Sequence, residues 1–238
     1  MKKIALVTGG GSGIGRAIAL GLALLGSEVF LGGRDERRLQ VVADEIARQG
    51  GRAWPCAGDL ADDAQLRKLA QRVLDEGGGI DVLVNCAGSF KMGSWESEPV
   101  EDLDELYRIT LRAPYQLTQL LLPALKARTG QVVFINSSAA LMAGAKWGAY
   151  SAMKAGLKSL ADSLRAEVNS SGVRVVSVFP GRTATPMQER IFGLENRPYS
   201  RENLIQPEDV ARMVVAALEL PHTAEVTDIF VRPTKKLA

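Results

Sequence analysis

The chain has 238 residues, of which 46% are hydrophobic and 24% are charged, a composition typical of a globular protein with a sizeable core. Its 29 Lys and Arg residues nearly balance its 27 Asp and Glu residues, so the net charge of +2 argues against a nucleic-acid-binding surface. The single histidine, His222, excludes multi-histidine metal sites and leaves no histidine well placed for a Ser-His-Asp triad. We therefore expect no metal site, and any enzymatic acid or base must be another side chain.

Cysteine usage and hydropathy indicate where the protein works. Cys56 and Cys86 are far apart and give no disulfide framework, which favours a reducing compartment. The apolar run Ile4–Val7 is too short for a signal peptide, and no uncharged apolar stretch approaches the roughly 18 residues of a membrane span. We expect a cytoplasmic protein with no membrane partner.

Short apolar runs alternate with longer amphipathic ones. The short runs predict strands at Ile4–Thr8, Glu28–Leu31, Arg52–Cys56, Asp81–Asn85, Gln131–Asn136, Val173–Phe179 and Val226–Val231. The amphipathic runs predict helices at Ile14–Leu25, Asp35–Gln49, Asp62–Glu76, Val100–Leu111, Pro114–Ala127, Tyr150–Ser170 and Pro207–Glu219. Uniformly apolar strands separated by helices indicate a parallel sheet covered on both faces. We predict a doubly wound, Rossmann-type α/β fold of about seven strands, forming a single domain over residues 1–238.

A glycine-rich turn follows the first predicted strand. Glycines let the backbone approach a ligand closely, and a helix N-terminus offers free N–H groups, so the turn suits a pyrophosphate. A P-loop is excluded because Arg16 stands where its lysine should be, and the literal Gly-x-Gly-x-x-Gly pattern also fails. The pattern that fits is Thr-Gly-x-x-x-Gly-x-Gly, formed by Thr8, Gly9, Gly13 and Gly15. The alternative is a glycine-rich turn that holds no ligand.

Further motifs follow in chain order at the ends of later strands. They are Asn85-Cys86-Ala87-Gly88, Ser137, the pair Tyr150 and Lys154 in Tyr-x-x-x-Lys, and Pro180-Gly181 with Thr185. Ser137 precedes Tyr150 by thirteen residues. With the glycine turn, this set resembles the short-chain dehydrogenase/reductase family in its single-domain form, over essentially the whole chain. The resemblance implies a seven-stranded parallel sheet that binds NAD or NADP, and hydride transfer between the nicotinamide and a carbonyl or alcohol.

The resemblance assigns the catalytic roles to Ser137, Tyr150 and Lys154. A spacing of four places Tyr150 and Lys154 on one helix face. Tyr150 would act as the general acid or base, helped by a nearby lysine cation that favours the phenolate. Ser137 would hydrogen-bond the substrate oxygen as charge develops on it. The neighbouring Ser138 is a rival that the thirteen-residue spacing disfavours.

The resemblance also implies a set of cofactor-binding residues. They are Thr8, Gly9, Gly11, Ser12, Gly13, Ile14, Gly15, Arg34, Asp59, Leu60, Asn85, Ala87, Gly88, Tyr150, Lys154, Pro180, Gly181, Thr183 and Thr185. For Asp59, the alternative is a simple cap of the helix that follows it.

The residues after the second strand favour NADP over NAD, although NAD stays possible. Gly33 occupies the position where NAD-preferring relatives carry an acid, and Arg34 stands where NADP-preferring relatives often carry a base. A guanidinium suits a ribose 2′-phosphate. The alternative is a solvated arginine paired with Asp35. Ser12 departs from the pattern, because many NADP-preferring relatives carry a second base there.

One family position is changed. Thr110 replaces the asparagine that in the family steadies a backbone turn and a water leading from the lysine to solvent. Threonine offers fewer hydrogen bonds than an amide. Three readings follow: a relay that tolerates Thr110, which we favour, a slower enzyme, or a protein that binds cofactor without turnover.

The substrate is expected to be a small or medium-sized carbonyl compound or alcohol. The less regular segment Met187–Leu204 should form a flap over it. The leading hypothesis is an NADP-dependent carbonyl reductase or alcohol dehydrogenase. The alternative is a catalytically weak or inactive nucleotide-binding regulator of the same fold. By resemblance, a homodimer or homotetramer is expected.

Overall fold

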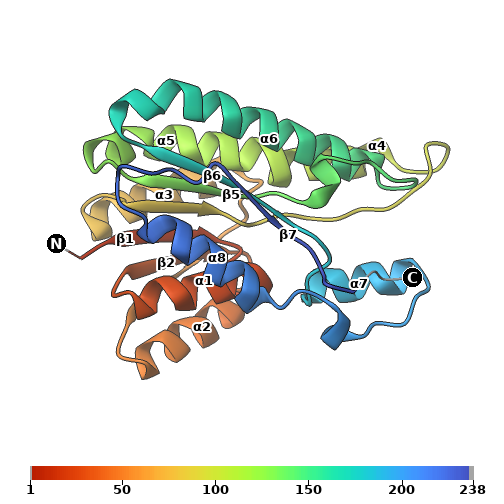
Figure 1. The fold of residues 1–238 in the computed structure, drawn as a ribbon, viewed down its shortest axis with the longest axis horizontal. Coiled ribbons are helices and arrows are strands. Elements are labelled where there is room, and N and C mark those ends of the chain that lie inside the picture. The colour runs from red at the N-terminus through yellow and green to blue at the C-terminus, as the bar shows by residue number, and fades with distance from the viewer. Residues whose placement is uncertain (1, 236–238) are drawn as a thin grey trace.

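A parallel sheet forms the centre of the molecule, described for residues 2–235 by a computed structural model (Figure 1). The strands are β1 Ile4–Thr8, β2 Glu28–Gly33, β3 Arg52–Ala57, β4 Val82–Asn85, β5 Gln131–Ile135, β6 Arg174–Pro180 and β7 Asp228–Val231. Their order is β3-β2-β1-β4-β5-β6-β7, and every neighbouring pair is parallel.

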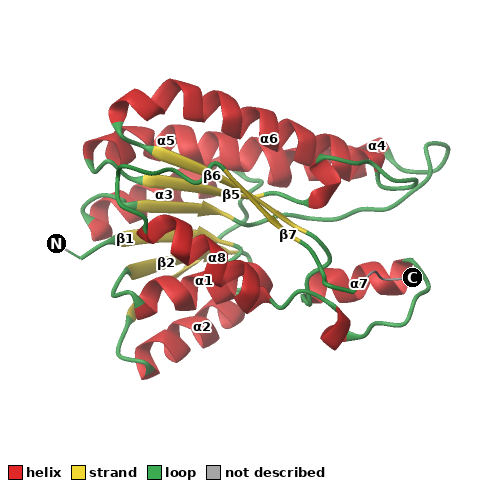
Figure 2. Cartoon of the chain, viewed as in Figure 1, coloured by secondary structure: helices red, strands yellow, loops and turns green. Residues whose placement is uncertain are grey.

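Helices cover both faces of the sheet (Figure 2). One face carries α1 Gly13–Leu24, α2 Glu36–Arg48 and α8 Pro207–Glu219, packed on a first hydrophobic cluster. The other face carries α3 Asp63–Gly77, α5 Ala113–Ala127 and α6 Gly148–Val168, packed on a second cluster. Helix α4 Val100–Tyr107 leads into α5. Helix α7 Pro186–Leu194 lies past the carboxyl ends of the strands. The predicted doubly wound, Rossmann-type fold is confirmed.

The amphipathic pattern explains how the helices attach. In α2 the buried residues are Leu39, Val42, Ala43 and Ile46, the stripe that the sequence predicts. Asp35 caps this helix by accepting a hydrogen bond from the backbone N–H of Arg38. Among residues 2–235, no helix is both long enough and apolar enough to cross a bilayer.

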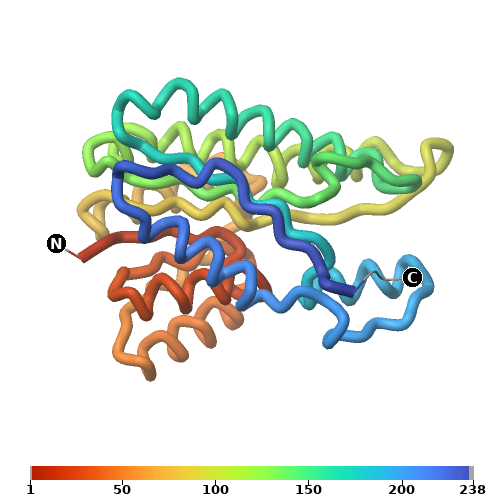
Figure 3. Tube along the Cα trace, viewed as in Figure 1, coloured from red at the N-terminus to blue at the C-terminus, as the bar shows by residue number. Residues whose placement is uncertain are grey.

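The strand order places the carboxyl ends of β1 and β4 side by side, where the winding of the chain reverses direction. Doubly wound sheets hold their ligands at this point. The tube drawing shows the C-terminal segment (blue) returning alongside β6, where β7 forms the edge of the sheet (Figure 3).

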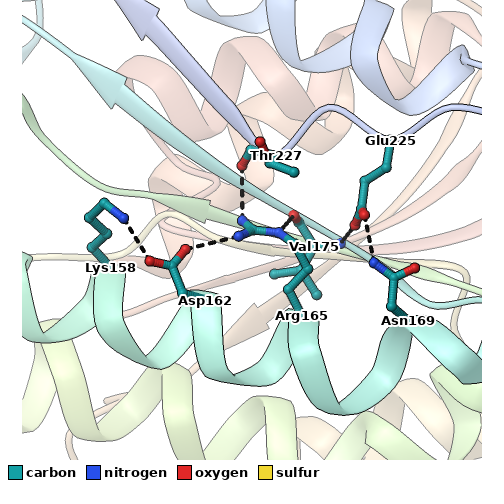
Figure 4. A network of polar contacts seen from close by, with 7 residues as sticks. All are labelled: Lys158, Asp162, Arg165, Asn169, Val175, Glu225 and Thr227. Carbon is teal, nitrogen blue, oxygen red and sulfur yellow. Dashed lines mark hydrogen bonds and ion pairs between the residues drawn. The ribbon is translucent and has the colours of Figure 1, made fainter.

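A network of polar contacts secures that edge (Figure 4). The carboxylate of Glu225 accepts hydrogen bonds of 2.9 Å from the Val175 backbone N–H and 2.7 Å from Asn169 Nδ2. Because β7 begins opposite Ser177, Glu225 supplies the acceptor that β7 does not reach at Val175. Arg165 of α6 donates to the carbonyl oxygens of Val175 and Thr227, joining both strands to the helix.

Two segments differ from the sequence prediction. The predicted helices Val100–Leu111 and Pro114–Ala127 are joined without a break through a π-helical turn at Arg108–Arg112. Within the predicted flap Met187–Leu204, which was expected to be less regular, α7 forms with Thr185 as its N-cap and Pro186 at its start.

Candidate active site

The glycine turn between β1 and α1 is shaped by close backbone packing. Gly9 and Gly13 have φ angles of +68° and +52°, which favour glycine. A Cβ on Gly15 would lie 2.4 Å from the carbonyl oxygen of Gly9, so no other residue fits there without a shift. Ser12 is the N-cap residue of α1, yet its side chain makes no capping hydrogen bond. The first amide groups of α1 are thus left to a ligand.

Thr8 fixes this turn against the end of β4. Its Oγ1 accepts hydrogen bonds from the backbone N–H groups of Cys86, at 2.9 Å, and Ala87, at 3.1 Å. The hydroxyl also donates to the Val84 carbonyl oxygen at 3.3 Å. Thr8 therefore holds the two strand ends together and does not itself line the cavity beside them.

A cavity of about 300 Å³ lies along the carboxyl ends of the strands. Most of the predicted site residues line it: Gly9, Ser12, Gly13, Ile14, Gly15, Arg34, Leu60, Ala87, Gly88, Ser137, Tyr150, Lys154, Pro180, Gly181, Thr183 and Thr185. Ser138 does not line it and begins a short 3-10 turn. The structure thus brings together motifs that are spread over most of the chain.

Four other predicted residues do not line the cavity. Asn85 is buried, and its Nδ2 donates to Thr118 Oγ1 at 3.1 Å. Asp59 accepts from the backbone N–H of Ala61 and so stabilises a turn, while Asp62 is the N-cap residue of α3. Gly11 packs against Arg38, where a Cβ would approach the Arg38 Cβ to 3.1 Å. Thr110, the fourth, is described below.

Ser137, Tyr150 and Lys154 come together from two elements. Ser137 follows β5, and its Oγ accepts a 3.1 Å hydrogen bond from the backbone N–H of Ala139. Lys154 is buried on α6, and its Nζ donates to the carbonyl oxygen of Ile135 at 2.9 Å. The same ammonium lies 5.9 Å from the centre of the Tyr150 ring. Phe90 packs against the other side of the site, with its ring centre 5.0 Å from that of Tyr150.

Burial sets the protonation of these groups. Burial raises the pKa of Tyr150 above its ordinary value, and a hydrogen bond with Ser137 opposes this rise. Burial also lowers the pKa of Lys154 to about 8. The sequence led us to expect a depressed tyrosine pKa. In the protein alone the pKa of Tyr150 is raised instead, because desolvation of the phenol outweighs the hydrogen bond with Ser137.

Thr110 lies in the π-helical turn, 1% exposed, and does not line the cavity. Its Oγ1 has no hydrogen-bond partner among the described residues. Ile109, its neighbour in the same turn, does line the cavity. The turn therefore reaches the site through Ile109, with the Thr110 hydroxyl enclosed behind it. Single π-turns inside helices are frequent at functional sites.

The end of β2 presents a free guanidinium. Asp35, the partner that the alternative interpretation gives to Arg34, pairs with Arg38, whose Nε lies 3.1 Å from the carboxylate. Arg34 is exposed, lines the cavity, and makes no ion pair or side-chain hydrogen bond with any residue between 2 and 235. Gly33 also lines the cavity, and a Cβ there would come no closer than 3.4 Å to the Leu39 side chain.

The sequence did not point to several residues of the cavity wall. They are Cys86, Ser89, Ile109, Ile135, Asn136, Pro186, Met187, Gln188 and Ile191. Met187 and Ile191 fall inside the predicted flap but carried no distinguishing signal. Burial raises the pKa of the Cys86 thiol to about 12, so it is an unreactive part of the wall. Within residues 2–235, no group of three or more His, Cys, Asp or Glu side chains is arranged to hold a metal ion.

Comparison with known proteins decides the family. The short chain dehydrogenase family model matches residues 3–195. The chain belongs to the short-chain dehydrogenase/reductase family. An uncharacterised short-chain type dehydrogenase/reductase of Sinorhizobium fredii is 36% identical to it, covering 98% of this chain and 92% of the relative.

Solved structures of other short-chain dehydrogenases/reductases share the fold. A metagenomic short-chain oxidoreductase in complex with NADP has a TM-score of 0.85 and 33% identity, with 98% of each chain covered. An alcohol dehydrogenase of the archaeon Thermococcus sibiricus, complexed with 5-hydroxy-NADP, has a TM-score of 0.91 and 25% identity, covering 100% of this chain and 99% of that one.

Proposed function

We propose that the protein is an NADP(H)-dependent oxidoreductase that interconverts a carbonyl compound and a secondary alcohol. The observation that carries this proposal is that Ser137, Tyr150 and Lys154 line one cavity with the glycine turn. The cofactor bound in the related structures supports it.

The residues present fit a dinucleotide phosphate. The uncapped N-terminus of α1 offers amide donors for a pyrophosphate, beside a turn in which Gly15 leaves no room for a side chain. Arg34, which has no ion-pair partner among residues 2–235, offers a fork of donors suited to a 2′-phosphate. Gly33 presents no carboxylate that would repel this phosphate. This arrangement favours NADP(H) over NAD(H).

The catalytic roles follow from the donor groups of the cavity. When bound, the cofactor supplies or accepts the hydride. In the reductive direction Tyr150 donates its phenolic proton to the carbonyl oxygen, while the Ser137 hydroxyl donates a hydrogen bond to the same oxygen. The Lys154 ammonium, held by the Ile135 carbonyl, stabilises the phenolate that remains.

The test is the loss of NADPH absorbance against a panel of ketones and aldehydes. We expect turnover with NADPH, a lower kcat/KM with NADH, and loss of activity in Tyr150→Phe with NADPH binding retained. A clear preference for NADH would overturn the cofactor assignment.

A second candidate is a nucleotide-binding regulator with little or no activity. Thr110 favours it, because a threonine whose hydroxyl has no hydrogen-bond partner in the described part of the chain stands where the family carries a catalytic-site asparagine. NADPH binding without turnover of any compound in the panel would support the regulator and contradict the enzyme.

We further propose that the protein is a cytoplasmic homodimer or homotetramer. Exposed apolar side chains on α4 and α5, namely Val100, Leu103, Tyr107 and Tyr115, support an association surface. Light scattering measures the mass in solution, and a monomer would contradict this assignment.

A further inference from the structure

Helix α7 presents an apolar stripe next to the catalytic residues. Met187 and Ile191 are one helical turn apart, and both line the cavity that contains Ser137 and Tyr150. Leu194 continues the same stripe away from the cavity and is 58% exposed. Such a stripe normally faces a core, but this one faces the space that a substrate must enter.

The opposite side of α7 fixes the helix in place. Phe192 is buried in a small cluster with Ala184 and Leu204, separate from the two clusters under the sheet. Arg182 Nη2 lies 2.7 Å from Glu195 Oε1, just past the end of the helix. Hydrogen bonds between Ile205 and the backbone of Arg182 and Ala184 close the base of the segment. The stripe is therefore carried by an anchored helix.

The charged side chains that line the cavity offer no counter-ion for an anionic substrate beside the stripe. The described residues that line the cavity include no carboxylate, and their only cations are Arg34 and Lys154. Arg34 follows β2, and Ser137 follows β5, with β1 and β4 lying between these two strands. Lys154 is held by the Ile135 carbonyl. Of the cations outside the cavity wall, Lys91 is paired with Asp102 and Glu105, at 2.8 and 2.7 Å, and Arg190 of α7 is exposed and does not line the cavity.

A carboxylate or phosphate brought between Tyr150 and α7 would lose water without gaining a counter-ion, which is strongly unfavourable. An apolar group placed there would instead bury its surface against Met187 and Ile191. We propose that the substrate is an uncharged ketone or aldehyde whose apolar substituent, aryl or alkyl, lies along the Met187–Ile191 stripe. This inference rests on the proposed oxidoreductase function.

The test compares two compounds that differ only in a remote charge. One is a phenyl-substituted methyl ketone carrying a para-carboxylate, with saturated carbons separating the ring from the carbonyl. The other is its methyl ester. Their carbonyl groups are equally reactive because the chain insulates them from the ring substituent. With the wild-type protein and NADPH, we expect kcat/KM for the ester to exceed that for the carboxylate by at least about tenfold.

Charge added to the stripe should reverse this selectivity. Ile191→Lys is expected to lower kcat/KM for the ester and raise it for the carboxylate, because the ammonium supplies the missing counter-ion. Met187→Lys repeats the test at the neighbouring position, should Ile191→Lys fold poorly. Gly193→Lys is the matched control, since Gly193 is exposed on the far side of α7 with nothing within 4 Å of a Cβ. It should leave both values unchanged.

The outcomes separate the substrate class from the function. If the wild-type protein turns over the carboxylate as well as the ester, or if neither lysine variant changes their ratio, the substrate class is wrong while the oxidoreductase stands. If NADPH binds, as followed by its fluorescence, but no carbonyl compound is reduced, the oxidoreductase function fails and this inference fails with it.

Discussion

The ammonium group of Lys154 donates a 2.9 Å hydrogen bond to the backbone carbonyl of Ile135, at the end of strand β5. Lys154 is 5% exposed, and this carbonyl replaces little of the water that the ammonium loses. Desolvation consequently lowers its pKa to about 8. The lysine that the resemblance assigns to catalysis therefore changes charge within an ordinary working range of pH.

Stability should depend on pH through Lys154. Because its pKa is lower in the folded protein than the roughly 10.4 of an unfolded chain, the unfolded state holds an extra proton between about pH 8 and 10. Folding stability should therefore gain from Lys154 as pH rises through this window. Lys154→Met removes the gain, so urea unfolding should show a stability advantage of the variant that shrinks from pH 7 to pH 10. The raised pKa of Cys56 is common to both proteins and leaves the difference unaffected. The charge of Cys86 interacts with that of Lys154, so both proteins carry Cys86→Ala in this comparison. An advantage that stays constant with pH would contradict the burial argument.

Arg34 should determine the choice of cofactor. We expect Arg34→Ala to raise KM for NADPH at least about tenfold, since hydrogen bonds to charged groups contribute about 1.5–3 kcal/mol, with little effect on NADH. Gly33→Asp should shift preference toward NADH, and the 3.4 Å clearance to Leu39 leaves room for its Cβ. Arg37→Ala, a neighbouring exposed arginine, is the matched control. Equal losses for both cofactors in Arg34→Ala would argue against a 2′-phosphate contact.

Thr110 should act through its backbone turn and not through its hydroxyl. The enclosed Oγ1 has no hydrogen-bond partner within residues 2–235, so Thr110→Val keeps the shape of the side chain and removes an unsatisfied polar atom. We expect kcat within about twofold of wild type and an unchanged or higher free energy of unfolding. Thr110→Asn should give no large gain in kcat. A strong fall of kcat in Thr110→Val would place the hydroxyl in the proton relay. A large rise of kcat in Thr110→Asn would show that threonine makes the enzyme slow.

Sequence reasoning reached the sheet and most of the cavity because the signals there are local. Uniformly apolar strands and the apolar stripe of α2 predict which residues are buried. Because the strands are parallel, their carboxyl ends lie along the same edge of the sheet. Gly15 could be assigned from spacing alone, because the turn that brings it against Gly9 demands a glycine.

The rest depends on tertiary contacts that no local pattern encodes. Helix α7 was missed because its stripe faces a cavity, although Thr185 and Pro186 are ordinary helix-start residues that could have revealed it. The position of Asn85 toward Thr118, away from the cavity, depends on how α5 packs. The pairing of Asp35 with Arg38 instead of Arg34 is likewise a matter of helix geometry.

Glu225 should stabilise the sheet edge without affecting catalysis (Figure 4). Glu225→Ala leaves the buried N–H of Val175 without its acceptor, which costs about 1–3 kcal/mol. Glu225→Gln keeps an acceptor oxygen and should lower the free energy of unfolding by less than Glu225→Ala does. Urea unfolding measures both, and kcat with NADPH should be unchanged in each. Equal stability of Glu225→Ala and wild type would show that water replaces the carboxylate at no cost.

Glu195 should control how firmly α7 is held over the cavity. Its carboxylate contacts Arg182 at 2.7 Å and lies 3.7 Å from Arg197, and both guanidinium groups stack on Phe192. Glu195→Ala leaves these two cations to repel each other beside the helix. We expect faster amide hydrogen exchange over residues 186–194 and a KM for the carbonyl substrate raised about three- to tenfold, because the partly buried pair contributes roughly 1 kcal/mol.

Two controls separate this effect from a general loss of structure. The Kd for NADPH should change less than this KM, since the glycine turn lies between β1 and α1 and Arg34 directly follows β2. Glu189→Ala, which removes an exposed carboxylate from α7 itself, should leave both exchange and KM at wild-type values. If exchange over 186–194 in Glu195→Ala equals that of wild type, the cluster around Phe192 holds the helix without the ion pair, because its buried apolar surface is then sufficient.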